Sequence, residues 1–187
     1  MASHVLNAYT NKSADMKLYY SLSIALIVLT LDLVTKYWIQ TSMVYGQQIP
    51  VTDFFNLVLT YNTGAAFSIL SEASGWQRWF LSAIAAGASI VIIYMLNKYK
   101  TEQLFCLSLS LILGGAIGNL WDRITLGYVV DFLDFYIGEY HWPAFNIADS
   151  AIFIGAALLI IDSFYNKENT PEEVNGKSDG KEKTEKL

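Results

Sequence analysis

Four long apolar segments constrain what this 187-residue chain can fold into. Each is close to the roughly 20 residues that a helix needs to cross a bilayer. They are Leu18–Ile39, Trp79–Leu96, Leu104–Trp121 and Phe145–Ile161. Because 53% of the residues are hydrophobic and lie in such blocks, the pattern is typical of a membrane protein. We therefore expect an all-α integral membrane protein with four transmembrane helices.

The lysines and arginines near the helix ends predict the orientation of these helices. Five lysines lie on the side of the termini and of the turn after the second segment, whereas Arg78 and Arg123 lie on the other side. Both termini are therefore expected in the cytoplasm, with the loops 40–77 and 122–144 outside. The first segment has no small-residue cleavage site behind it, so we interpret it as an anchor and not as a signal peptide.

We expect three regions along the chain: a cytoplasmic segment over 1–17, a membrane domain over 18–165 and a tail over 166–187. The tail holds six acidic residues and five lysines without apolar periodicity, which predicts a disordered, charged cytoplasmic segment. The loop after the first helix is different. Residues 56–62 partly alternate apolar and polar side chains, which predicts a short strand, and Thr63-Gly64 predicts a turn.

Composition argues against several classes of function. A net charge of −5 without a basic stripe is not typical of a nucleic-acid-binding protein. Cys106 is the one cysteine, which excludes an internal disulfide and a cysteine-based metal site. Its apolar context predicts a small core residue rather than a nucleophile. The two histidines are far apart and no HExxH motif is present, so a zinc protease is not expected.

Polar residues concentrate between the third and fourth apolar segments. Asn119, Asp122 and Arg123 follow an i, i+3, i+4 spacing and would share one helix face, as would Asn146 and Asp149. Asp149 is expected about one turn inside an apolar helix, where its neighbours cannot solvate it. An intramembrane carboxyl of this kind is a functional-site candidate by default.

Spacing alone does not identify the carboxyl that would act with Asp149, and Asp131, Asp134 and Asp122 all remain candidates. Asp134 and Glu139 are interpreted as solvated loop charges.

Several other residues carry structural interpretations. Asp32 and Lys36 are an i, i+4 pair, which predicts a structural ion pair or a lysine that extends to the interface. Arg123 could form a surface pair with Asp122 or find a more distant partner. Pro143 is placed as a first-turn proline of the fourth helix, and Gly114 and Gly118 predict a close helix approach.

Two chemistries fit carboxyls at one edge of a bilayer. Two aspartates in contact can share a proton and activate water, or carboxyls can line an ion path. A path needs polar groups along the membrane depth, whereas here they crowd at one edge, which favours a surface-proximal active site. A non-enzymatic assembly factor, with the polar cluster as a docking surface, remains an alternative. A serine–lysine peptidase using Lys36 lacks a suitably spaced outer serine, and the GxGD motif of other intramembrane aspartyl proteases is absent.

Five blocks of sequence resemble the lipoprotein signal peptidases, the type II signal peptidases of bacteria. They are Asp32-Leu33-Val34-Thr35-Lys36, Asn62-Thr63-Gly64-Ala65-Ala66-Phe67, the GxxxNxxDR run from Gly115 to Arg123, Val129-Val130-Asp131-Phe132 and Phe145-Asn146-Ile147-Ala148-Asp149. Their joint order over residues 18–165 is specific, although Leu33 stands where the family commonly has glutamine, at a peripheral polar contact.

The resemblance implies an intramembrane aspartyl endopeptidase with four transmembrane helices, a small extracytoplasmic β-sheet and a short extracytoplasmic helix. It assigns catalysis to Asp131 and Asp149. It places substrate binding at Asn62, Gly64, Asn119, Arg123 and Asn146, and structural support at Asp32, Lys36 and Asp122.

The implied substrate is a prolipoprotein, cleaved just before a cysteine that carries a diacylglyceryl group. The implied location is the bacterial inner membrane, with the active site at its outer face. The resemblance implies no metal and no organic cofactor, no nucleic-acid partner, and a monomer in contact with membrane lipid.

Overall fold

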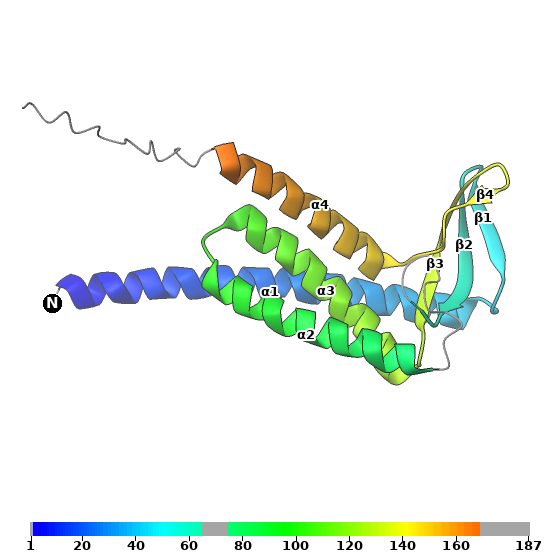
Figure 1. Cartoon of the computed structure of the whole chain (residues 1–187), viewed down its shortest axis with the longest axis horizontal. Helices are drawn as coiled ribbons and strands as arrows, with labels where there is room; N and C mark the ends of the chain where they lie inside the picture. The colour runs from blue at the N-terminus through cyan, green and yellow to red at the C-terminus, as the bar shows by residue number, and fades with distance from the viewer. Residues whose placement is uncertain (1, 65–74, 169–187) are drawn as a thin grey trace, which may run out of the picture.

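The computed structural model describes residues 2–64 and 75–168, and it gives four helices and four strands within these ranges (Figure 1). The helices are α1 (Ala2–Ser42), α2 (Trp76–Lys98), α3 (Gln103–Thr125) and α4 (Ile147–Glu168). The strands are β1 (Gln48–Thr52), β2 (Phe55–Asn62), β3 (Val129–Ile137) and β4 (Tyr140–His141).

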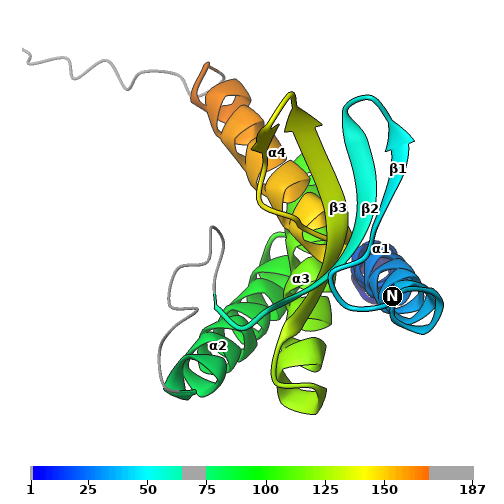
Figure 2. The same ribbon diagram turned by 90° about the vertical axis from the view of Figure 1, so that its right-hand side faces the viewer.

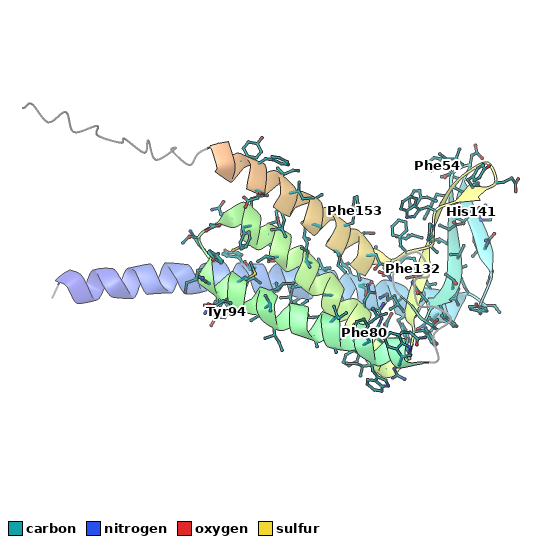
Figure 3. The ribbon with its side chains drawn as sticks, in the orientation of Figure 1. Phe54, Phe80, Tyr94, Phe132, His141 and Phe153 are labelled. Atoms are coloured by element: carbon teal, nitrogen blue, oxygen red, sulfur yellow. The ribbon has the colours of Figure 1, made fainter. Side chains whose placement is uncertain are left out.

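All four helices are long and apolar enough to cross a membrane, over Lys17–Ser42, Trp76–Lys98, Gln103–Thr125 and Ile147–Tyr165. The four predicted segments are therefore confirmed, with ends that shift by a few residues. Large apolar side chains such as Ile90, Tyr94 and Phe153 are exposed on the outside of the bundle (Figure 3). A helix that is apolar all round is typical of a segment surrounded by lipid.

Helix α3 lies at the centre of the bundle and packs against α1, α2 and α4 (Figure 2). Close approach is possible because glycines replace side chains at the contacts, as the small-residue spacing predicted. A Cβ on Gly114 would lie 2.6 Å from the carbonyl oxygen of Ala25 in α1. A Cβ on Gly118 would lie 2.5 Å from Asp32 Oδ2. Backbones that approach this closely bring polar side chains of neighbouring helices into direct contact.

The strands form one antiparallel sheet with the order β1-β2-β3-β4, which lies across one end of the bundle (Figures 1 and 2). The strand predicted over 56–62 is confirmed as β2. Ile39 of α1 and Met43, which follows the helix, pack with Leu59, Val130 and Phe132 in a buried cluster that joins this sheet to the bundle. The all-α description is thus too narrow.

The two ends of the bundle differ. The sheet lies at one end, and the α2–α3 turn, the N-terminus and the end of α4 lie towards the other (Figure 1). The start of α1 and the end of α4 lie towards the same end, as expected if an even number of helices crosses the membrane. Helix α1 begins at Ala2, so the predicted segment 1–17 is continuous with it. The short helix outside the membrane is not among the elements of the described ranges, and the predicted tail falls mostly outside them, at 169–187.

Candidate active site

Helix α4 begins with a reciprocal capping arrangement that fixes Asp149. Asn146 immediately precedes the helix, and its Oδ1 accepts a hydrogen bond of 2.9 Å from the backbone N–H of Asp149. In return, the backbone N–H of Asn146 donates to Asp149 Oδ2 over 3.3 Å. This is the capping-box geometry, with the acid in the third helical position. The prediction that Pro143 occupies the first turn is wrong, because Asn146 provides the cap and the helix starts at Ile147.

Strand β3 brings Asp131 to the same place. Asp131 pairs with Thr60 of β2, and its Oδ2 accepts a hydrogen bond of 3.2 Å from Asn62 Nδ2. Its Oδ1 accepts a shorter bond of 2.7 Å from Asn146 Nδ2. The Asp131 side chain is buried, with 2% exposure, whereas Asp149 is only partly buried. Solvent therefore reaches Asp149 but is almost excluded from Asp131.

Asn146 bridges the two carboxyls. Its side-chain amide donates to Asp131, and its backbone amide donates to Asp149. Asn119 of α3 completes the set, since its Nδ2 donates to Asp149 Oδ1 over 2.8 Å. Each oxygen of each carboxyl thus receives one N–H, and every donor is an uncharged amide.

The surroundings of Asp131 change its proton affinity. Burial is the largest effect and the nearby charge of Asp149 adds to it, so the pKa of Asp131 rises to about 7. The hydrogen bonds from Asn62 and Asn146 and the charge of Lys36 act in the opposite direction without cancelling the rise. At neutral pH this carboxyl is therefore divided between its protonated and ionised forms.

A second pair of aspartates lies beside the first, but it is compensated by a lysine. Lys36 Nζ lies 2.7 Å from Asp32 Oδ2 and 3.0 Å from Asp122 Oδ2, and it donates to Asn119 Oδ1 over 3.0 Å. All of these side chains are buried, and Lys36 is 2% exposed. The predicted structural ion pair between Asp32 and Lys36 is therefore confirmed. The alternative, a lysine that extends to the membrane interface, is wrong because Lys36 is buried.

The compensated aspartates hold the backbone next to the other pair. Asp122 Oδ2 accepts a hydrogen bond of 3.2 Å from the N–H of Val130, the residue before Asp131. Asp32 Oδ1 accepts one of 2.9 Å from the N–H of Ala148, the residue before Asp149. One lysine-centred ion cluster therefore fixes both the strand and the helix that carry the candidate catalytic carboxyls.

Arg123 takes a distant partner, as one of the two alternatives expected. Its Nη2 donates to the carbonyl of Gly64 over 3.0 Å, beside Asn62. The carbonyl of Arg123 accepts a 2.6 Å bond from Arg78 Nε, and Arg78 Nη2 donates to Ile124 O over 2.7 Å. The sequence marks Arg78 only as a positive charge near a helix end, because a lone arginine at the start of α2 gives no signal that it caps the end of α3. Residues 65–67 of the Asn62 block lie outside the described residues.

The interpretation of Asp134 as a solvated charge is wrong. Asp134 is buried and accepts a 2.9 Å hydrogen bond from Asn56 Nδ2, and it lies 2.9 Å from His141 Nδ1. It points to the opposite side of β3 from Asp131, since the two residues are three positions apart and side chains alternate along a strand. Asp134 is therefore not a partner for Asp149. Glu139 is exposed, as expected.

The half of the bundle away from the sheet has an apolar interior. Ala25, Ile92, Leu96, Leu109 and Leu113 form a buried cluster there, which includes the Cys106 thiol as predicted. The buried serines at this depth, Ser21, Ser108 and Ser110, each donate to a carbonyl of their own helix. Among the described residues no buried charged side chain lies along this cluster, which argues against an ion path. Within 2–64 and 75–168 no group of three or more His, Cys, Asp or Glu side chains could hold a metal ion.

Comparison with known proteins gives a consistent result. Residues 24–165 match the family model of signal peptidase (SPase) II. A lipoprotein signal peptidase of Janthinobacterium sp. is 57% identical over 141 residues, which are 75% of this chain and 86% of that protein. One from Burkholderia vietnamiensis is 54% identical over 152 residues, covering 81% and 92%.

Solved structures agree. A bacterial membrane enzyme determined by the in meso method at 2.3 Å resolution is 37% identical and superposes with a TM-score of 0.74. The match covers 82% of this chain and 93% of that one. The chain therefore belongs to the signal peptidase II family.

Proposed function

We propose that this peptidase of the signal peptidase II family uses an aspartic mechanism, with Asp131 and Asp149 as the catalytic pair. The observation that carries the proposal is the bridge made by Asn146, which bonds both carboxyls at 2.7 and 3.3 Å. A raised pKa of about 7 at Asp131, caused by burial and by Asp149, is what a pair sharing one proton requires.

The pair would act on a water molecule and a peptide bond. The ionised carboxyl takes a proton from water as the water oxygen attacks the carbonyl carbon, while the protonated carboxyl gives its proton to the carbonyl oxygen. The tetrahedral gem-diol then breaks its C–N bond. The amine leaves with a proton from one carboxyl, while a hydroxyl group of the diol gives its proton to the other carboxylate as the new carboxyl product forms. The two carboxyls return to sharing one proton.

The surrounding polar residues would orient the substrate. Arg123 holds the carbonyl of Gly64, and this fixes the end of β2 beside the site. Asn62, Gly64, Asn119, Arg123 and Asn146 are proposed as the substrate-binding set. Asp32, Lys36 and Asp122 are proposed as its structural support, and the domain over 18–165 as the unit that carries it.

The proposed substrate is a prolipoprotein whose signal peptide crosses the membrane and whose cysteine carries a diacylglyceryl group. Relatives that are 54% to 57% identical are named lipoprotein signal peptidases. The site lies where α4 begins and α3 ends, next to the sheet and at one end of the four possible membrane spans, which supports a position near the membrane interface. A lipid-bearing cysteine is held at that level. We propose that this face is the outer face of the bacterial inner membrane, with both termini in the cytoplasm.

The test is an assay with purified protein and two substrates, a diacylglyceryl-modified prolipoprotein and the same chain without lipid. Wild type should cleave the modified substrate only, and Asp131→Asn or Asp149→Asn should abolish cleavage. Asp53→Asn, which changes an exposed carboxyl in the β1–β2 turn, is the matched control and should retain activity. Turnover by a folded Asp131→Asn or Asp149→Asn protein would remove that residue from the pair, and cleavage of the unmodified chain would exclude the lipid requirement.

A further inference from the structure

A cavity with both polar and apolar lining lies at the end of the bundle opposite the sheet. It has a volume of about 230 Å³ and is formed by residues 17–24 of α1, the α2–α3 turn and the first turns of α3. A water molecule occupies about 30 Å³ in the liquid, so this space accommodates a polyatomic group. The peptidase site does not involve this region, which is separated from it by the apolar cluster around Leu109 and Leu113.

The lining changes from polar to apolar with depth. On α1, Lys17, Ser21 and Ile24 lie on one face, and Ile24 is about 10 Å further along the helix than Lys17 at 1.5 Å per residue. On α3, Gln103 is at the first position and Leu107 lies about 6 Å deeper. Donor groups thus line the outer part and hydrocarbon lines the inner part. A soluble anion needs no apolar floor, whereas a phospholipid has this same order from headgroup to acyl chain.

The charged side chains that line the cavity are both positive. Among residues 17–20 and 97–107 the charged side chains are Lys17, Lys98, Lys100 and Glu102. Lys17 and Lys100 line the cavity, whereas Lys98 lies outside it with its ammonium 5.0 Å from the centre of the Tyr99 ring. Basic pockets between transmembrane helices at the membrane surface are typical binding sites for anionic lipid headgroups.

We propose that this cavity binds the phosphate headgroup of an anionic phospholipid from the leaflet opposite the sheet. Lys17 and Lys100 contact the phosphate, Gln103 donates to its oxygens, and the acyl chain follows Ile24 and Leu107. The bound lipid would connect residues 17–24 of α1 to the α2–α3 turn at the membrane surface. The inference rests on the spans and on this cavity, and it holds whether or not the proposed aspartic mechanism does.

The experiment measures lipid binding to the full-length protein in a neutral detergent by native mass spectrometry. Phosphatidylglycerol and phosphatidylcholine with identical acyl chains are titrated separately. Each lysine beside an anionic headgroup contributes about fivefold in affinity, so Lys17→Ala with Lys100→Ala should weaken phosphatidylglycerol binding about thirtyfold. Phosphatidylcholine binding should not change. Lys98→Ala removes the same charge at the same end but outside the cavity, and should bind as wild type does.

Single Lys17→Ala and Lys100→Ala variants, each expected to lose about fivefold, keep the test valid if the double variant does not fold. Inorganic phosphate and glycerol 3-phosphate are added as competitors and should not displace the lipid. Unchanged phosphatidylglycerol affinity in folded lysine variants would overturn the proposal, as would an equal loss in Lys98→Ala. Displacement by either soluble anion would show that the site takes free phosphates and would overturn the lipid assignment.

Discussion

Two pairs of aspartates lie at the same end of the bundle and differ in what compensates them. Asp32 and Asp122 share the ammonium of Lys36, at 2.7 and 3.0 Å. Asp131 and Asp149 receive their close hydrogen bonds from uncharged amides of asparagine side chains and of the backbone. A carboxyl group that contacts a buried cation forms an ion pair that holds structure in place. A carboxyl buried among neutral donors can gain or lose a proton, which is what acid–base chemistry needs.

The two pairs are connected through the backbone. Asp122 accepts a hydrogen bond from the N–H of Val130, the residue before Asp131. Asp32 accepts one from the N–H of Ala148, the residue before Asp149. The ion cluster is therefore placed to support the proposed catalytic pair, and the two should respond differently to the loss of a carboxylate.

The largest expected difference is in catalysis. Asp131→Asn removes a proton-transfer group and should lower kcat/KM about 10⁴-fold, because positioned acids and bases contribute up to that factor. Folding should persist, since asparagine resembles the protonated carboxyl that burial already favours at Asp131. The measurement is kcat/KM together with a thermal melt in detergent.

Asp122→Asn is the matched comparison, because it makes the same change in the other pair. It should lower the melting temperature, since it leaves the buried Lys36 with one carboxylate and weakens the hold on Val130. If Asp131→Asn unfolds the protein while Asp122→Asn abolishes turnover at full stability, the roles of the two pairs are reversed.

The next largest effect is on stability. Lys36→Met leaves two buried carboxylates without their cation, and breaking a buried pair in this way costs about 3–5 kcal/mol. The free energy of unfolding, measured by denaturant titration in detergent micelles, should fall by that amount. Lys98→Met removes an exposed lysine from α2 and should leave it nearly unchanged. A Lys36→Met protein as stable as wild type would show that the ion cluster is not the support.

A smaller effect is expected from the glycine against which Asp32 packs. A Cβ at Gly118 would lie 2.5 Å from Asp32 Oδ2, so Gly118→Ala must displace the carboxylate oxygen that Lys36 contacts. Overpacking of this kind costs about 1–3 kcal/mol, which a thermal melt would detect. Gly87→Ala is the control, because no atom lies within 4 Å of a Cβ there. Equal stability of the two variants would mean that the contact with Asp32 does not constrain the cluster.

Sequence predicts the bundle well because each span is a local property of about 20 consecutive residues. The strand at β2 was also visible from its alternation. The sheet as a whole was less so, because β3 lies between polar motifs and its pairing with β2 joins residues about 70 positions apart along the chain. Asp134 was misjudged for the same reason, since its partners Asn56 and His141 come from other strands.

The site was predictable in part. Spacing identified Asp149 and the shared face of Asn119 and Arg123, but it could not choose among three carboxyls as the second acid. That choice depends on which side of β3 a side chain faces. Asp131 and Asp134 face opposite sides because side chains alternate along a strand. The link from Lys36 to Asp122 crosses two helices, and no local pattern encodes it.

The smallest expected effect concerns pH. The reactive pair needs one proton, so kcat should fall as the pH rises through the pKa of about 7 at Asp131, with the pair titrating as a unit. Asn62 donates to Asp131 Oδ2 and lowers this pKa, so Asn62→Ala should raise it and move the upper limb of the profile to higher pH. One hydrogen bond of about 1 kcal/mol corresponds to a shift of about 0.7 pH units. The profile of kcat between about pH 5 and 9 measures this shift.

Thr60→Ala is the control, because it changes a β2 residue opposite Asp131 without removing the Asn62 donor. It should leave the upper limb of the pH profile in place. A limb that stays fixed or moves to lower pH in Asn62→Ala would mean that the proton lost near neutrality is not held at Asp131, and the contrast between the two aspartate pairs would then need another physical basis.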